Sequence, residues 1–179
     1  RYALHKSDAH LQAAHAVCNW SVIWDDHEVE NDYVAQYGRG EPAHFLERRM
    51  AAWQAFYENM PLRPAVMLRN QQGLALYRTL NWGRLARLHM LDGRQYRSLQ
   101  PCSAGLASRK GHVAPESCAD LDDPARTFLG FEQERWLYDG FKDAPARWNF
   151  LAQGLKMTPM RFAANDGFLE WTDTWDGFA

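Results

Sequence analysis

Five carboxylates, one histidine and one amide crowd into residues 25–32, directly after the apolar run Trp20–Ile23. The carboxylates are Asp25, Asp26, Glu28, Glu30 and Asp32, and the other two polar groups are His27 and Asn31. Like charges this close together, at the end of a buried element, repel one another strongly. Any fold for this chain must therefore spread the carboxylates into water or neutralise some of them with a cation.

The length of 179 residues suits one well-buried domain, so we expect a single domain over residues 1–179. Hydrophobic residues make up 46% of the chain and charged residues 23%, which is typical of a folded soluble protein. A net charge of −2 argues against a nucleic-acid-binding surface, and no apolar stretch approaches the roughly 20 residues that span a bilayer. Because the chain starts at Arg1 and closes on the aromatic segment 175–179, we interpret both ends as cuts through a larger protein. The domain is then expected to be partial, with an incomplete fold at both ends.

Apolar periodicity predicts an α/β fold. Residues at three- and four-residue spacing indicate helices over 8–17, 42–60 and 130–141, with Ser7 capping the first and the apolar stripe of the second packing into the core. Short apolar runs indicate strands over 20–24, 74–80, 85–91 and 148–151, with a tight turn at 81–83 and loop after 151. A buried parallel strand over 20–24 would place the acidic segment at its carboxyl end, where open α/β sheets bind ligands.

Three cysteines form no metal cluster. Cys102 and Cys118 flank an irregular stretch, and a disulfide that closes this loop would fit an exported protein and contribute about 3 kcal/mol. Two unpaired loop thiols are the alternative. Cys18 is interpreted as a small core residue.

The acidic segment suits a metal ion by its chemistry. Carboxylate oxygens, an imidazole and an Asn carbonyl are ligands for cations such as Ca²⁺, Fe³⁺, Mn²⁺ or Zn²⁺. The spacing matches neither an EF-hand loop nor the His-Glu-x-x-His helix of zinc proteases. A solvated acidic loop with one or two helix-capping carboxylates is the alternative, and the segment alone does not decide between them.

Two arginines, Arg94 and Arg97, follow a different predicted strand. Strand-end loops tend to gather at one edge of a sheet, so these side chains are expected near the acidic segment. An arginine beside a metal would hold two oxygens of a phosphate ester while the cation takes a third. Ordinary surface ion pairs are the alternative. Because the acidic segment alone would repel a phosphate, cleavage of a phosphoester requires the metal.

Several motifs resemble one family in their order along the chain. They are Trp24-Asp25-Asp26-His27-Glu28-Val29-x-Asn31, Leu91-Asp92-x-Arg94-x-Tyr96-Arg97, Leu129-Gly130-x-Glu132-Gln133-x-x-Trp136-Leu137, Trp148-Asn149 and Trp175-Asp176-Gly177-Phe178. Together they resemble the alkaline phosphatase D (PhoD-like) metallophosphoesterases, and they cover nearly the whole chain.

The resemblance implies a metallophosphoesterase-type sandwich of mixed β-sheets flanked by helices. It also implies hydrolysis of small phosphate esters, monoesters or diesters, by hydroxide that a metal centre activates, with iron and calcium as the expected metals and manganese or zinc as alternatives. By position, Asp26 would be a metal ligand, and Asp25, Glu28 and Asn31 would act as further ligands or supports of the ligands. His27 and Arg94 would be catalytic residues, and Arg94 and Arg97 would bind the phosphate.

The resemblance further implies a periplasmic or secreted protein. The family's outer metal-binding segments do not lie within residues 1–179, so this part alone is expected to bind metal weakly and to be a poor catalyst. A catalytically inactive interaction domain, which uses the acidic segment as a structural calcium site, is the alternative function. The sequence does not indicate the leaving group or the oligomeric state.

Overall fold

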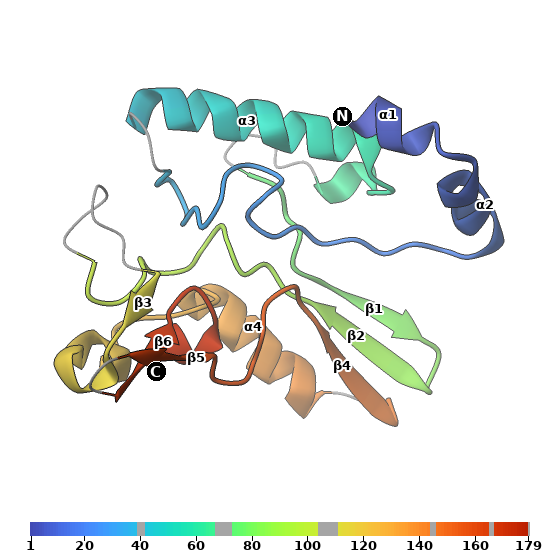
Figure 1. Cartoon of the computed structure of the whole chain (residues 1–179). Helices are drawn as coiled ribbons and strands as arrows, with labels where there is room; N and C mark the ends of the chain where they lie inside the picture. Colours follow the sequence, from blue (N-terminus) through green and yellow to red (C-terminus); the bar gives the residue numbers. More distant parts are fainter. Residues whose placement is uncertain (39–41, 67–72, 104–110, 144–145, 165–166, 179) are drawn as a thin grey trace.

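The computed structural model describes residues 1–38, 42–66, 73–103, 111–143, 146–164 and 167–178, and they form a mixed α/β arrangement (Figure 1). The helices are α1 (Tyr2–Lys6), α2 (Ala9–Val17), α3 (Pro42–Asn59) and α4 (Phe131–Lys142). The strands are β1 (Arg78–Trp82), β2 (Ala86–Met90), β3 (His112–Val113), β4 (Trp148–Ala152), β5 (Arg161–Ala164) and β6 (Gly167–Trp171). Short 3-10 helices are η1 (Pro64–Val66), η3 (Pro115–Ser117), η4 (Ala119–Asp122) and η5 (Trp175–Gly177).

The strands form two separate three-stranded sheets. In the mixed sheet, β2 lies between β1 and β4, antiparallel to β1 and parallel to β4. In the antiparallel sheet, β6 lies between β3 and β5. Strand β2 ends at Met90, and the polar segment 92–97 follows directly, so this strand carries Arg94 and Arg97 toward the acidic segment.

Two apolar clusters hold these elements in place. The first packs α3 against residues 24–33 and is built from Trp24, Val29, Tyr33, Phe45, Trp53, Phe56, Val66, Leu74 and Leu76. The second packs α4 and the end of the chain against Leu91, through Phe128, Leu129 and Phe178. Each large apolar side chain buried in this way stabilises the fold by about 1.5–3 kcal/mol.

The long helices agree with the sequence prediction. Helix α3 ends just before Pro61, and Phe45, Trp53 and Phe56 of its apolar stripe are buried as expected. Two further members of the stripe are exposed: Leu46 is 38% exposed and Met50 is 43% exposed. The prediction that the stripe packs into the core is therefore confirmed only in part. Helix α4 matches the predicted helix to within one residue at each end.

Helix α2 has a different cap from the predicted one. Its N-cap is Asp8, whose carboxylate accepts a hydrogen bond from the Leu11 N–H at 2.9 Å, whereas the Ser7 hydroxyl donates to the Leu4 carbonyl. The helix buries no residue, and Cys18, at its end, is exposed and not part of the core.

The predicted strand over residues 20–24 is wrong. The segment is extended but pairs with no strand in the part of the chain that the structure describes. A side chain takes the place of a neighbouring strand as hydrogen-bond partner: the Arg78 guanidinium donates to the Val22 carbonyl at 2.9 Å. Trp24 then anchors the end of the segment in the first apolar cluster.

Other strand boundaries also differ from the prediction. Strands β1 and β2 begin at Arg78 and Ala86, and their turn covers residues 83–85, where Gly83 has a φ of +54°. The loop predicted after residue 151 is wrong, because β5 and β6 form an antiparallel hairpin there. An ion pair between Arg161 and Glu170, at 2.9 Å, ties the two strands together.

No helix in the described ranges combines the length and the apolar character that crossing a membrane requires.

Candidate metal centre

The acidic segment is wound into consecutive turns that bring Asp26 and Asp32 together. The Asp26 carbonyl accepts backbone hydrogen bonds from Val29 at 2.9 Å and Glu30 at 2.8 Å. The Asp26 carboxylate accepts another from the Asp32 N–H at 2.8 Å. Asp32 has a φ of +53°, in the left-handed region that Asp adopts more readily than most residues. The segment therefore folds back so that Asp26 and Asp32 share one site.

The two glutamates of the segment turn away from this site. Glu28 accepts a hydrogen bond from the Asp25 N–H at 2.9 Å, and Glu30 pairs with Arg48 on α3 at 3.0 Å. The expected repulsion among the five carboxylates is thus relieved partly by neighbouring donors. The aspartates remain as the charged groups that need a counter-charge.

Arg94 supplies part of that counter-charge from the segment after β2. Its Nε donates to the Asp25 carboxylate at 2.6 Å, and its two terminal nitrogens donate to Asp173 at 3.1 and 2.8 Å. One of these nitrogens also lies 3.9 Å from an Asp26 carboxylate oxygen. Burial lowers the pKa of the Arg94 guanidinium, but Asp173 and Asp25 outweigh that effect and raise the pKa above its ordinary value.

Asp92 sets the position of Arg94. Its carboxylate accepts hydrogen bonds from the backbone N–H groups of Arg94 at 2.9 Å and Gln95 at 3.0 Å, which closes a tight turn. The Asp92 backbone is in turn bonded to the buried Gln133 side chain of α4, through N–H and carbonyl at 2.9 Å each. Burial raises the pKa of Asp92 above its ordinary value despite these donors.

Asp173 is the buried partner of both arginines. Besides the bonds from Arg94, its carboxylate accepts from Arg97 at 2.8 Å and from the Gln100 amide at 2.9 Å, and its side chain is 1% exposed. Burial raises the pKa of Asp173, but Arg97 and Arg94 lower it by more, so the pKa lies below its ordinary value. Asp173 is therefore held as a carboxylate at the centre of the site.

Arg97 is stacked as well as paired. Its guanidinium carbon lies 5.3 Å from the ring centre of Phe128 and 5.1 Å from that of Phe178. Burial lowers the pKa of Arg97 to about 10, although Asp173 opposes the shift. The side chain remains charged at neutral pH.

Three carboxylates converge at this place. Asp26, Asp32 and Asp173 each offer one oxygen, and these oxygens all lie within 4.8 Å of one another. Oxygens bound to one Ca²⁺ lie at most about 5 Å apart, so the spacing suits a single ion. The donor type and the spacing both fit a hard divalent cation.

His27 lies at the rim of this group of carboxylates. Its side chain is 75% exposed, and its Nε2 lies 2.9 Å from the Asn31 side-chain oxygen and 3.7 Å from an Asp26 oxygen. The hydrogen bond with Asn31, followed by the charge of Asp26, raises the pKa of the imidazole. The Asn31 amide nitrogen donates to Asp32 at 2.7 Å, so Asn31 links the histidine to the carboxylates.

The structure sorts the residues that the sequence singled out. Asp26 belongs to the converging carboxylates, whereas Asp25 pairs with Arg94 and Asn31 contacts Asp32, both beside them. The phosphate contacts expected of Arg94 and Arg97 stay a prediction, because both guanidinium groups are buried against carboxylates. The sequence analysis included Asp32 in the acidic segment but did not single it out as a candidate ligand, and it missed Asp173 and Gln100 altogether. Only the neighbouring motif at 175–178 marked the region of Asp173.

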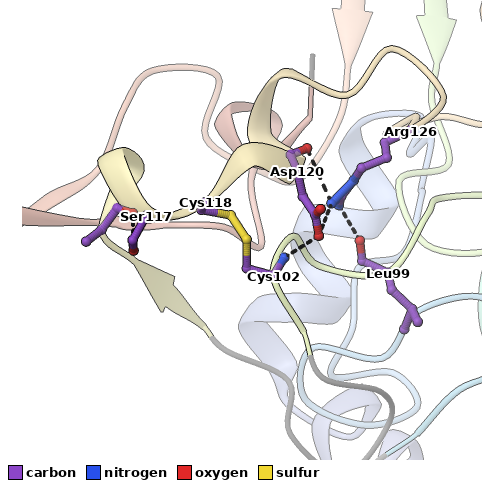
Figure 2. The surroundings of a disulfide bond; sticks show 7 residues. Leu99, Cys102, Ser117, Cys118, Asp120 and Arg126 are labelled. Atoms are coloured by element: carbon purple, nitrogen blue, oxygen red, sulfur yellow. Dashed lines mark hydrogen bonds and ion pairs between the residues drawn. A yellow bond between two sulfur atoms is a disulfide. The ribbon is translucent and has the colours of Figure 1, made fainter.

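Cys102 and Cys118 are joined by a disulfide close to this site (Figure 2). Their Cα atoms lie 5.8 Å apart, and Cys102 lies two residues after Gln100. The pairing is the one expected for an exported protein.

Comparisons with known proteins agree with one another. The family model of the PhoD-like phosphatases matches residues 1–179. Alkaline phosphatase D of Bacillus subtilis (strain 168) is 41% identical over 181 aligned residues, which cover 99% of this chain and 29% of that protein. A solved structure described as the structure of PhoD superposes with a TM-score of 0.85 at 41% identity, over 99% of this chain and 33% of that one.

The chain thus spans about a third of the length of the relatives that it matches. The structural match confirms the predicted fold class, a mixed α/β fold of the metallophosphoesterase type. The similarity of sequence and the similarity of fold cover the same residues. The chain belongs to the PhoD-like phosphatase family.

Proposed function

We propose that the full-length protein hydrolyses phosphate esters at a metal centre that includes Asp26, Asp32 and Asp173. The observation that carries the proposal is the convergence of these three carboxylates in a member of a phosphatase family. The three converging carboxylates offer a bound cation oxygen ligands from one side. When bound, such a cation acts as a Lewis acid on the phosphoryl group and makes water a better nucleophile near neutral pH.

The residues around the carboxylates have separate tasks in this proposal. Arg94 holds Asp25 and Asp173 in fixed orientations, and Arg97 keeps Asp173 ionised. His27, exposed at the rim, donates a proton to the leaving alkoxide, and its raised pKa favours the protonated form that this task needs. Contact of Arg94 with the phosphate requires that one of its carboxylate bonds be exchanged for a phosphate oxygen. Arg97 keeps Nε and Nη1 without a hydrogen-bond partner among the described residues, so it could add such a contact without losing its bond to Asp173.

The nature of the metal and the location of the protein are part of the same proposal. Three carboxylate oxygens are a hard donor set, which favours calcium, and further ligands from the rest of the protein would accommodate iron, manganese or zinc. The disulfide suits an oxidising compartment, which supports a periplasmic or secreted protein. The proposed substrate is a small phosphate monoester or diester.

The test uses the full-length protein with p-nitrophenyl phosphate and bis(p-nitrophenyl) phosphate. Hydrolysis is measured before chelation, after chelation, and after calcium and iron are returned. Cys18→Ser is the control variant, because Cys18 is exposed and its thiol donates to the Ala14 carbonyl of α2. We expect chelation to abolish the activity and the metals to restore it. Activity that persists both after chelation and in Asp173→Asn would refute the proposal.

A non-catalytic domain with a structural calcium site is the second candidate. The all-oxygen donor set favours it, since calcium needs no other ligand type. Elemental analysis of the full-length protein separates the two functions. One equivalent of calcium, no transition metal and no hydrolysis of either ester would support the structural site.

A further inference from the structure

Gln100 joins two of the three converging carboxylate residues directly. Its side-chain amide nitrogen donates to the Asp32 backbone carbonyl at 3.0 Å and to the Asp173 carboxylate at 2.9 Å. The residue is 3% exposed, and its amide oxygen is buried without a hydrogen-bond partner among the described residues. A change in the position of this amide therefore moves Asp32 relative to Asp173.

Two charged side chains, those of Asp120 and Arg126, bind the backbone on either side of Gln100 and form a clamp. The Arg126 guanidinium donates to the Leu99 carbonyl, and it also lies 3.5 Å from the Asp120 carbonyl and 3.6 Å from the Asp120 carboxylate. The same carboxylate accepts a hydrogen bond from the Cys102 N–H at 2.7 Å. Figure 2 shows Asp120 between Arg126 and Cys102, with Leu99 on the far side of the arginine.

The disulfide fixes this clamp covalently. Cys118 precedes η4, the helix that carries Asp120, so the disulfide and the Asp120 hydrogen bond hold Cys102 against the same short element. Cys102 has a φ of +52°, a conformation that L side chains rarely adopt and that persists only where the surroundings impose it. Without the disulfide, the backbone at Cys102 is free to relax, and Gln100 moves with it.

We propose that Gln100 is a positioning residue of the metal centre, and that the Cys102–Cys118 disulfide, acting through Asp120 and Arg126, holds it in place. The inference rests on the proposed cation site. The disulfide would then increase the affinity for the cation, in addition to stabilising the fold by restricting the unfolded chain. Residues that orient the ligands of a metal typically change its affinity by about 10- to 100-fold when they are mutated.

The test measures calcium binding to the full-length protein by titration calorimetry, and terbium binding by luminescence. Cys102→Ser/Cys118→Ser and Gln100→Leu are compared with the wild type and with Cys18→Ser, which removes the exposed free thiol. We expect calcium to bind about 10- to 100-fold more weakly in the first two proteins and unchanged in the control. The increase in Tm that calcium causes is recorded as well, because a purely structural role lowers the Tm of the metal-free protein but leaves this increase intact.

A further variant covers the case in which loss of the disulfide prevents folding. Asp120→Asn keeps the disulfide and weakens the hold on Cys102 and Arg126, so its calcium affinity is expected to fall while its near-ultraviolet circular dichroism stays native. If Gln100→Leu and Asp120→Asn both bind calcium with wild-type affinity, the inference about Gln100 is overturned, but the proposed cation site is not. A wild-type protein that binds neither calcium nor terbium would overturn the proposed cation site and the inference with it.

Discussion

The Arg94 guanidinium donates one hydrogen bond to each carboxylate oxygen of Asp173, at 3.1 and 2.8 Å, and both side chains are 1% exposed. The pair comes from segments 79 positions apart, one after β2 and one after β6. Two parallel hydrogen bonds of this kind fix orientation as well as distance. The pair therefore joins the segments that follow the mixed sheet and the antiparallel sheet at the candidate metal centre.

Replacing Arg94 should destabilise the protein strongly. In Arg94→Met, Asp25 loses its bond from Arg94, and Asp173 loses the two of its four described side-chain hydrogen bonds that Arg94 donates. A buried pair that loses one partner costs about 3–5 kcal/mol. Arg94→Lys should recover only part of this, because an ammonium cannot make both bonds. The free energy of unfolding in urea measures the effect. Arg161→Met removes the more exposed pair with Glu170 and is the control, expected to cost at most about 1 kcal/mol; equal losses in the two Met variants would contradict the central role of Arg94.

Replacing His27 should impair catalysis without affecting stability. The side chain is 75% exposed and so contributes little packing, whereas loss of a general acid lowers kcat by about 10²- to 10⁴-fold. The expected result for His27→Ala is a large fall in kcat for p-nitrophenyl phosphate with an unchanged Tm. His10→Ala, at another exposed position, serves as the control. A variant with full activity would remove His27 from the proposed mechanism.

Asp92 should make stability depend on pH in an unusual direction. Its folded pKa is raised above the ordinary value of 3.8, so the folded state binds more protons than the unfolded state between 3.8 and the raised pKa. The contribution of Asp92 to stability therefore falls as the pH rises through this interval. In Asp92→Asn this pH-dependent contribution is absent, because the amide does not titrate. Unfolding in urea at a series of pH values should show the stability of the wild type minus that of the variant decreasing as the pH rises; an increasing difference would show that the pKa is lowered.

Adding a methyl group at Gly177 should displace the backbone next to Asp173 and so disturb the candidate metal centre. A Cβ there would lie 2.2 Å from the Thr172 carbonyl oxygen and 2.9 Å from its carbon, both backbone atoms next to Asp173. Gly177→Ala is expected to lose roughly 1–3 kcal/mol by overpacking and to weaken calcium binding. Gly111→Ala is a matched control, since nothing lies within 4 Å of its Cβ. Urea unfolding and calorimetry measure both effects, and identical behaviour of the two variants would rule out the clash.

Removal of the cation should lower the thermal stability of the full-length protein. A ligand that binds only the folded state stabilises it by about 2.7 kcal/mol at a hundred times its Kd. Calcium is therefore expected to raise the Tm of the wild type and not that of Asp173→Asn, which lacks one carboxylate of the centre. Differential scanning calorimetry with calcium and with chelator measures the difference. An equal rise in both proteins would place the calcium elsewhere.

The sequence was informative where a pattern is local. The apolar spacing that predicts α3 and α4 depends only on residues a few positions apart, and both helices form nearly as expected. The strand predicted over 20–24 failed because a short apolar run does not reveal whether a backbone partner exists; here the Arg78 side chain takes that place. The β5–β6 hairpin was missed because it lies in a stretch rich in turn-forming residues.

The metal centre could be predicted only in part for the same reason. The density of charge at residues 25–32 marked Asp26 and indicated a cation. Asp173 carries no local signal, since a single aspartate between two threonines acquires its role only through contacts with Arg94, Arg97 and Gln100. Likewise, the charge of Arg94 was evident from the sequence, but the carboxylates that occupy its guanidinium were not.

The contacts of Asp173 also bear on the order of events during folding. Its bonds to Arg94, Arg97 and Gln100 span 79, 76 and 73 positions, so the chain must close large loops before any of them forms. Contacts of such wide separation slow folding and form only after their entropy cost has been met. On the ribosome, Asp25 and Asp26 emerge long before Asp173 is synthesised. Calcium affinity is thus expected to arise late during biosynthesis, and its appearance would mark a nascent chain that has completed its tertiary structure.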